Sequence, residues 1–305
     1  MSEFTTRFAP SPTGPLHLGH AYSALLAHDM AVKNGGDFLL RIEDIDRERS
    51  KPQWEEQIYQ DLTWLGLCWP TPCLRQQTRQ AAYDTALDKL WNMGLLYPCT
   101  CRRRDIQEAL SAPQEGAPLM GPDGLVYPGT CRGLPAGFFP EEHPRPMDTV
   151  LRLDMARATR ESDLFKTQTE PDNPFVSYGY FKELGEGPNG ETGDVEFTPD
   201  DLIHRVGDVV LSRKGFGTSY HLSVVLDDAF QGVTHVVRGQ DLFEATPIHV
   251  LLQSLLGLTT PVYHHHGLIR DDAGKRLAKR DDARAIATYR AEGATPTDIR
   301  KMIGL

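Results

Sequence analysis

The chain has 305 residues and a formal net charge of −10, which is enough material for one large or two modest domains with a buried core. No apolar run reaches membrane-spanning length, and the start MSEFTTRFAP lacks the pattern of a secretion signal, so we expect a cytoplasmic protein with reduced thiols and no membrane partner. The acidic balance argues against a surface that coats nucleic acid broadly, although it permits a local basic track.

The N-terminal segment predicts a βαβ unit. A strand at residues 6–9 runs into a segment rich in Pro and Gly, and a helix at about 17–33 and a strand at 37–42 follow. Pro15 stands where a helix can begin, since its missing N–H costs nothing there. His17 and His20 share one helix face, beside free N–H groups that favour phosphate oxygens. Taken alone, such a pair is more often a surface or capping feature.

The middle of the chain begins with helical patterns and then loses them. Helices are predicted after Pro52 and at residues 80–93, the second with Gly94 as its C-cap. Residues 99–196 are irregular and rich in Pro and Gly, which predicts an inserted domain. Within it, residues 183–196 read as a solvent loop with Gly and acids.

Periodicity recovers in the last third of the chain, in segments 208–211, 220–226 and 234–238. Thr246 and Pro247 then predict another helix, with Thr as its cap and Pro at its first position. The segment GKRLAKR, residues 274–280, carries four cations beside a flexible Gly. It suits a mobile loop that stabilises departing pyrophosphate, although a basic run alone is usually a solvated face.

The cysteines offer one candidate metal site. Cys99 and Cys101 are one residue apart, and Cys131 follows Tyr127 by four residues. Such a pair in a reducing compartment can bind zinc, while spacing alone is equally compatible with ordinary thiols near a loop. The rival pair, residues 68 and 73, adjoins prolines in a connecting segment and is interpreted as structural.

Several of these segments carry a family resemblance. RFAPSPTGPLHLGH resembles the nucleotide-binding motif of class I aminoacyl-tRNA synthetases, and RLAKR resembles their mobile lysine loop. FLLRIEDIDRER, YHLSVVLDD and GVTHVVRGQDL resemble the glutamate branch. The resemblance implies an α/β fold, a Rossmann-type doubly wound parallel sheet with an inserted, zinc-containing subdomain. It also implies a short helical C-terminal tail and no anticodon-binding domain.

The resemblance divides the chain and assigns its site. The two halves of the nucleotide-binding domain are expected at residues 1–98 and 197–280. The inserted subdomain is expected at 99–196, and the helical tail at 281–305. The implied glutamate site comprises Arg7, Phe8, Ala9, Pro10, Ser11, Glu43, Tyr220 and Arg238, since an amino acid needs cations for its carboxylates and an anion for its ammonium group. The implied ATP site comprises His17, Gly19, His20 and Lys279, of which His17, His20 and Lys279 are catalytic. One structural zinc ion is expected on Cys99, Cys101, Tyr127 and Cys131, and Mg²⁺ is expected with ATP.

The resemblance extends to a reaction. Only 25 residues follow Arg280, and Val224 stands where ordinary glutamyl enzymes have Asn; both features resemble a truncated branch of the family. That branch activates glutamate with ATP, without tRNA, and transfers it to the queuosine base in the anticodon of tRNA(Asp). Because valine cannot hydrogen-bond a substrate, we expect a weaker glutamate affinity. Arg276 and Ala278 replace the usual lysine and serine of the loop, so the sequence does not predict the rate of the reaction.

Three other functions remain compatible with the sequence. A truncated glutamyl-tRNA synthetase would charge the 3′ end of its tRNA. A small-molecule nucleotidyltransferase would use the same histidine pair without RNA, and a non-catalytic synthetase paralogue would only bind RNA or a partner. The inserted segment disfavours the second, and His17, His20 and Lys279 together disfavour the third. A monomer is expected.

Overall fold

The computed structural model describes residues 3–111, 120–122, 124–133, 140–166, 169–170, 173–269 and 284–305. The chain opens with the expected βαβ unit, built from β1 (Thr5–Phe8), α1 (Leu18–Lys33) and β2 (Asp37–Ile42). β1 and β2 pair in parallel, and β3 (Leu74–Arg75) extends this sheet in parallel beyond β2. The prediction of this unit is confirmed, with the first strand one residue earlier than expected.

A second sheet continues from β1 in the opposite direction. Its order is β11-β10-β14-β13, and its strands are β10 (Gly179–Glu183), β11 (Gly193–Phe197), β13 (His235–Gly239) and β14 (Val262–His266). β13, β14 and β10 pair in parallel, while β11 is an antiparallel edge. Thr234 N donates to the Thr5 carbonyl (3.0 Å), so β13 begins beside β1. The α/β class with a parallel sheet is therefore confirmed, and the strand order diverges at β1 and β13.

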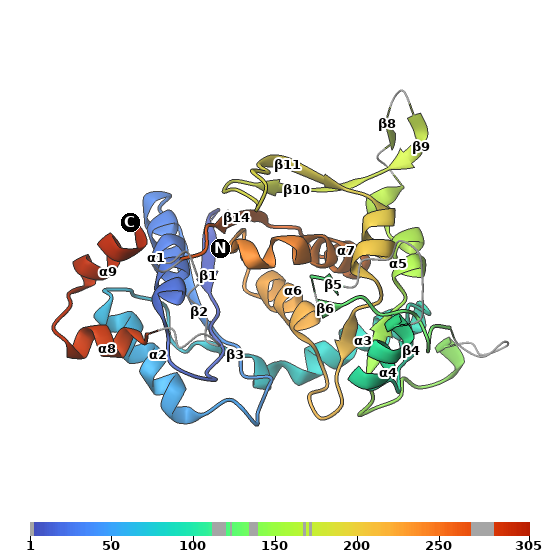
Figure 1. Ribbon diagram of the computed structural model, residues 1–305, viewed down its shortest axis with the longest axis horizontal. Helices are drawn as coiled ribbons and strands as arrows, with labels where there is room; N and C mark the ends of the chain where they lie inside the picture. Colours follow the sequence, from blue (N-terminus) through green and yellow to red (C-terminus); the bar gives the residue numbers. More distant parts are fainter. Residues whose placement is uncertain are drawn as a thin grey trace.

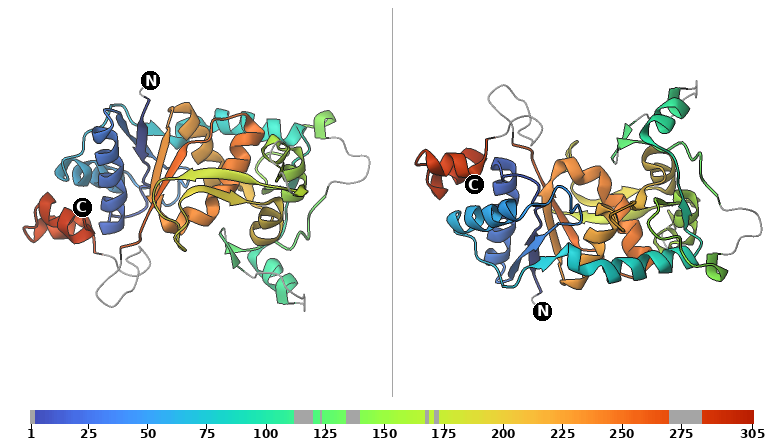
Figure 2. Two further views of the ribbon diagram at one scale, coloured as in Figure 1. Left: turned by 90° about the horizontal axis from the view of Figure 1, so that it is seen from above. Right: turned by 90° about the horizontal axis from the view of Figure 1, so that it is seen from below.

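Most of the described helices divide between two apolar cores. α1 and α2 (Pro52–Trp64) share one core with the C-terminal helices α8 (Ile286–Ala291) and α9 (Pro296–Ile303). α3 (Gln80–Asn92), α5 (Met155–Glu161), α6 (Tyr220–Phe230) and α7 (Thr246–Leu256) contribute to the other core. Figures 1 and 2 show the helices of the first core on one side of the molecule, opposite the green segments around α4 (Arg103–Ser111). The predicted helical tail is thus a packed part of the first core.

Charged contacts accompany this packing of the tail. Arg300 of α9 donates to Asp29 of α1 (2.6 Å), and Arg290 of α8 lies 3.4 Å from the buried Asp61 of α2. Ile299 of α9 is fully buried. Among the described residues, no helix combines the length and the apolar character that a bilayer crossing needs.

The irregular middle of the chain contains short elements. β4 (Leu96–Pro98), β7 (Leu151–Leu153) and β12 (Val210–Ser212) form an antiparallel sheet that connects residues on both sides of the insertion. Two hairpins are β5 (Met120–Gly121) with β6 (Gly124–Leu125) and β8 (Thr169–Glu170) with β9 (Asn173–Ser177). The short helical turns are η1 (Gln76–Arg79), η2 (Pro140–Glu142), η3 (Asp163–Phe165), the π-helix η4 (Asp201–Val206) and η5 (Gln240–Ala245).

One prediction for this middle region is wrong. Residues 183–196 were expected to be a solvent loop, but Glu183 is the last residue of β10 and is buried, and β11 begins at Gly193. Glu183 is buried because β10 pairs with β14, where Glu183 lies opposite Tyr263. A partner that is distant in sequence therefore overrides the local polar pattern.

Candidate active site

The helix that carries the paired histidines begins with a histidine cap. α1 starts at Leu18, and its N-cap is His17, whose Nδ1 accepts a hydrogen bond from Gly19 N (3.1 Å). His20 Nδ1 accepts in turn from His17 N (3.2 Å), and the two rings lie with centroids 3.8 Å apart. The prediction that Pro15 could open the helix is wrong, because an imidazole nitrogen supplies the cap two residues later.

This capping arrangement determines where the histidine protons lie. Because each Nδ1 accepts a backbone N–H, the neutral form of each ring carries its proton on Nε2. The helix start therefore offers fewer unpaired backbone N–H groups than the sequence predicted, since the two rings occupy some of them. The two imidazole rings lie near the positive end of the α1 dipole, which favours an anion.

A cavity of about 590 Å³ opens at the carboxyl ends of β1 and β13. This is the point where the strand order diverges, and such points are where open α/β sheets bind ligands. Its lining includes all the described residues that the sequence predicted for glutamate and ATP, namely Arg7, Phe8, Ala9, Pro10, Ser11, His17, Gly19, His20, Glu43, Tyr220 and Arg238. The fold thus brings residues from distant segments to one cavity.

The predicted lysine loop is the exception. Lys279 and the rest of segment 274–280 lie outside the described residues. On the two sides of that segment, Ile269 lines the cavity and Ala285 forms a β-bridge with His17. The role of Lys279 stays a prediction from the sequence.

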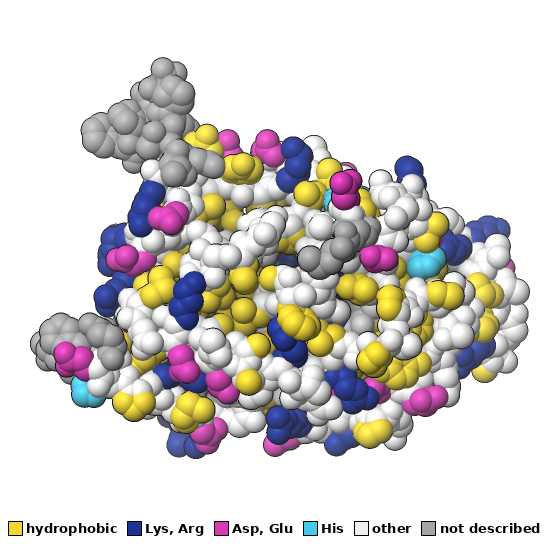
Figure 3. Space-filling model, turned by 180° about the vertical axis from the view of Figure 1, so that it is seen from behind, with side chains coloured by type: hydrophobic (Ala, Val, Ile, Leu, Met, Phe, Trp, Pro, Cys, Tyr) yellow, Lys and Arg dark blue, Asp and Glu magenta, His cyan; other side chains and the backbone are white. Residues whose placement is uncertain are grey.

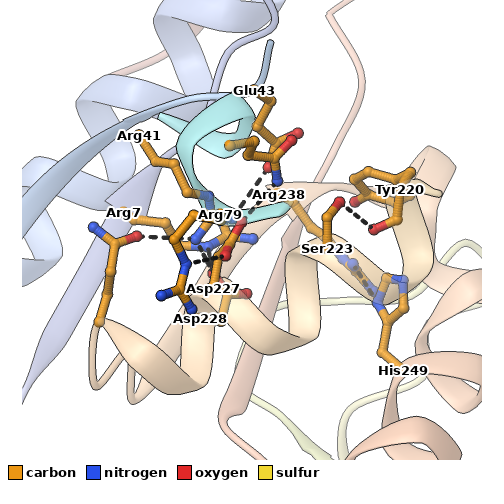
Figure 4. A network of polar contacts seen from close by, with 12 residues as sticks. Arg7, Arg41, Glu43, Arg79, Tyr220, Ser223, Asp227, Asp228, Arg238 and His249 are labelled. Carbon is orange, nitrogen blue, oxygen red and sulfur yellow. Dashed lines mark hydrogen bonds and ion pairs between the residues drawn. The ribbon is translucent and has the colours of Figure 1, made fainter. Parts of the chain in front are cut away.

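Buried ion pairs hold two of the residues that line the cavity (Figure 4). Arg7 Nε and Arg41 Nη1 both donate to Asp228 Oδ1, at 2.9 and 2.6 Å, and Arg41 Nη2 donates to Glu43 Oε1 at 3.1 Å. Burial tends to raise the pKa of Asp228, but the two guanidinium groups bring it below its usual range. Burial raises the pKa of Glu43, and Arg41 opposes this. Arg7 and Glu43 are therefore fixed in place before any ligand arrives.

Sequence reasoning missed the two residues that organise this network. Arg41 and Asp228 lie inside the segments FLLRIEDIDRER and YHLSVVLDD. The alternation of a strand puts Arg41 and Glu43 on the same face, so a pairing could have been inferred. The contact between Arg7 and Asp228 spans 221 residues and carries no local signal.

Helix α6 is anchored through a second buried carboxylate. Asp227 accepts hydrogen bonds from Gln76 Nε2 (3.0 Å), Arg79 Nε (3.1 Å) and Tyr83 Oη (2.8 Å). These donors belong to η1 and α3, so they fix the C-terminal half of α6 against the neighbouring helices. Tyr220, in the first turn of α6, is thereby held at the cavity.

Val224 lies one turn after Tyr220 on α6. Its side chain is buried in the larger apolar core, and it is not among the residues that line the cavity. An Asn at this position would place an amide in that core, where it would need a hydrogen-bonding partner. The expected effect of Val224 on glutamate affinity stays a prediction.

Arg238 is a buried cation whose hydrogen-bond partners among the described residues are all neutral. Its Nε donates to His265 Nε2 (3.0 Å), its Nη1 to His249 Nδ1 (3.0 Å) and its Nη2 to Thr246 Oγ1 (2.8 Å). Burial lowers the pKa of both histidines, so they are uncharged at neutral pH. No carboxylate within the described part of the chain forms an ion pair with Arg238.

The prediction that Thr246 caps α7 is wrong, since Ala245 is the N-cap.

The cysteine cluster lies at the opposite side of the larger core. The Sγ atoms of Cys99, Cys101 and Cys131 lie within 4.8 Å of one another, and Tyr127 Oη is 3.5 Å from Cys99 Sγ and 3.3 Å from Cys101 Sγ. The hydrogen bond from Tyr127 lowers the pKa of the Cys131 thiol to about 6, which favours its thiolate. The rival Cys68 is exposed.

This donor set fits zinc. Zn–S bonds of about 2.3 Å at tetrahedral angles would put the sulfurs about 3.8 Å apart, close to the 3.4 Å between Cys101 Sγ and Cys131 Sγ. Arg152 donates from Nε to Cys99 Sγ (3.3 Å) and covers the Tyr127 ring at 3.8 Å. Sequence reasoning did not single out Arg152, which would stabilise a thiolate at Cys99.

Residues 3–123 and 189–305 match the family described as tRNA synthetases class I (E and Q), catalytic domain. The chain belongs to this family, whose members are ligases.

The individual relatives narrow the family further. The chain is 62% identical over 304 residues to the glutamyl-Q tRNA(Asp) synthetase of Rhodobacter capsulatus, a match that covers 98% of this chain and 99% of the relative. A protein of the same name from Symbiobacterium thermophilum is 41% identical and is covered to 83%.

A solved structure agrees with this relationship. The glutamate-tRNA synthetase of Elizabethkingia anophelis superposes with a TM-score of 0.71 at 25% identity. The match covers 99% of this chain and 61% of that protein, so the chain spans about three fifths of its length.

Proposed function

We propose that this chain activates glutamate with ATP, without tRNA, and transfers the glutamate to a hydroxyl of the queuosine base in the anticodon of tRNA(Asp). The activation half of the proposal is carried by Arg238, a buried cation that lacks a carboxylate partner among the described residues and shares a cavity with the histidine pair. The acceptor half rests on the names of the similar relatives.

In the first step, a glutamate carboxylate attacks the α-phosphate of ATP and releases pyrophosphate. Arg7 and Arg238 are proposed to bind the carboxylates, and Glu43 the ammonium group, because a buried charge requires an opposite charge or strong hydrogen bonds. His17 and His20 would donate from Nε2 to the phosphates, and Lys279 would neutralise charge that develops in the transition state. Mg²⁺ enters with ATP, whose phosphates supply ligands.

The remaining assignments follow from the same family. One zinc ion on Cys99, Cys101, Tyr127 and Cys131 is proposed to be structural, since thiolates and a phenolate leave no position for a substrate in a four-coordinate site. On the face seen in Figure 3, Lys and Arg side chains are scattered among acidic and apolar side chains, in keeping with a limited RNA contact. We propose that the protein is cytoplasmic and monomeric.

The test is transfer of labelled glutamate to two purified tRNAs for aspartate, one with queuosine and one with guanine at that position. Label on the queuosine form alone, retained after removal of the 3′ end, is the expected result. Label lost with the 3′ end would instead identify a glutamyl-tRNA synthetase, like the similar solved structure from Elizabethkingia anophelis. Adenylate formation with neither tRNA labelled would point to another acceptor.

A further inference from the structure

A buried carboxylate lies directly behind Arg238. Glu183, at the end of β10, and His265, in β14, are each 1% exposed. Glu183 Oε2 is 2.5 Å from His265 Nδ1, and His265 Nε2 is 3.0 Å from Arg238 Nε. The three side chains therefore form one continuous row from the inner strand to the cavity wall.

The donors and acceptors of this row can be assigned. Arginine has no acceptor, so Arg238 Nε–H must donate to His265 Nε2, and that nitrogen carries no proton. The proton of the neutral imidazole then lies on Nδ1 and is donated to Glu183 Oε2. Glu183 Oε1 accepts from His265 N (2.8 Å) and Gly185 N (2.7 Å), so the backbone holds the carboxylate in register.

The electrostatics agree with this assignment. Burial tends to raise the pKa of Glu183, but its hydrogen bonds with His265 bring it below the usual range, so Glu183 is ionised at neutral pH. Burial lowers the pKa of His265. The row thus holds a negative charge, a neutral ring and the positive charge of Arg238.

We propose that Glu183 and His265 are positioning residues that hold the Arg238 guanidinium in the orientation that receives a carboxylate of glutamate. His265, His249 and Thr246 take three of its N–H groups, which leaves two of the five for a ligand. This inference rests on the proposed use of glutamate as substrate. Glu183 acts at a distance, because it sets the proton position of His265 and makes no contact with the ligand.

The chemistry of the row singles out Glu183→Gln as the informative change. The amide oxygen of Gln can replace Oε1 and accept from the two backbone N–H groups. Its NH₂ group then faces His265 Nδ1 as a donor, which moves the histidine proton to Nε2. Nε2–H would confront Arg238 Nε–H, donor against donor, and displace the guanidinium. The side chain keeps its shape, so the change acts through the proton.

The kinetic experiment measures glutamate-dependent ATP–pyrophosphate exchange in the full chain. Glu183→Gln is expected to raise the KM for glutamate by about tenfold or more, the equivalent of a single lost charge-assisted hydrogen bond, with the KM for ATP unchanged. The matched control is Glu196→Gln, which makes the same charge change at an exposed position of β11 and is expected to leave both constants unchanged. An unchanged KM for glutamate in Glu183→Gln would overturn the proposal.

A second measurement does not depend on the proposed substrate. Nitrogen NMR of histidine-labelled protein without ligand is expected to show the His265 proton on Nδ1, and on Nε2 in Glu183→Gln. A proton on Nε2 in the parent would overturn the proposal even if glutamate is activated. If the parent shows the expected proton position but no glutamate-dependent exchange, the proposed function fails while the hydrogen-bonded row stands.

A variant pair at His265 covers the case in which Glu183→Gln does not fold. His265→Gln offers an amide oxygen to Arg238 Nε–H, whereas His265→Leu offers no acceptor. The KM for glutamate is expected to stay closer to that of the parent in His265→Gln than in His265→Leu. Equal values in the two variants would contradict the positioning role.

Discussion

The strand-end cavity and the cysteine cluster are held in place by different means. Around the cavity, the charged side chains are fixed by buried partners: Asp228 bridges Arg7 and Arg41, and Asp227 ties α6 to α3. The cluster of Cys99, Cys101, Tyr127 and Cys131 belongs to a small apolar group that has three buried members among the described residues. A large core can orient a charged site by itself, whereas the proposed zinc ion would add the cross-links that a small apolar group does not supply.

This comparison is tested most severely at Asp228. Asp228→Asn leaves two buried guanidinium groups without their shared carboxylate and is expected to lower the free energy of unfolding by about 3–5 kcal/mol. Urea unfolding measures the effect, and Asp37→Asn, an exposed change in β2, serves as control. A loss no larger than that of the control would mean that the cavity does not depend on this ion-pair network.

Catalysis at the cavity is expected to depend on the histidine pair. His20→Ala removes one Nε2–H donor, and glutamate-dependent ATP–pyrophosphate exchange is expected to fall about 10²–10³-fold, as when one oxyanion donor is lost. His28→Ala, further along α1 and outside the cavity lining, should retain the parent rate. A rate drop shared by both variants would indicate helix damage instead of lost phosphate contact.

Replacing a cysteine of the cluster is expected to lower the affinity of the site for zinc. Cys101→Ser should lower zinc affinity by more than about a hundredfold, because even outer-shell partners cost 10–100-fold. Equilibrium dialysis followed by metal analysis measures this, and Cys68→Ser should keep one zinc ion per chain. Equal zinc in both variants would rule out the cluster as the site. Glutamate-dependent exchange is expected to be affected less than zinc content.

The smallest expected effect concerns Asp61, which lies beneath the C-terminal tail. Burial raises its pKa to about 6, and Arg290 opposes this. Because the unfolded chain releases this proton at lower pH than the folded one, the free energy of unfolding should fall by about 1–2 kcal/mol as pH rises from about 4 to 7. Asp61→Asn should flatten that slope, measured by urea unfolding across the range. An unchanged slope would assign the pH dependence to other groups.

Local signals in the sequence account for much of the fold. The segment at 17–33 and the strand at 37–42 follow from periodicity and turn residues, and both appear in the structure. Capping was an alternative reading of the His17 and His20 pair, and the structure confirms it, although capping statistics favour Ser, Thr, Asp and Asn over an imidazole. Thr246 was expected as a cap for the same statistical reason, but its hydroxyl accepts a hydrogen bond from Arg238 instead.

The sequence by itself determined the order of the motifs, the residue types that could bind an amino acid and ATP, and the spacing of the cysteines, because these are properties of neighbouring residues. Only the tertiary structure decided which charges are partnered. Asp228 meets Arg7 across 221 positions, and Glu183 meets His265 across 82. The polar sequence around Glu183 predicts a solvent-exposed loop, but the pairing of β10 with β14 buries Glu183. The physical reason is that a charged side chain can be buried only beside an opposite charge or strong hydrogen bonds, and here these partners come from elements that are distant in the sequence.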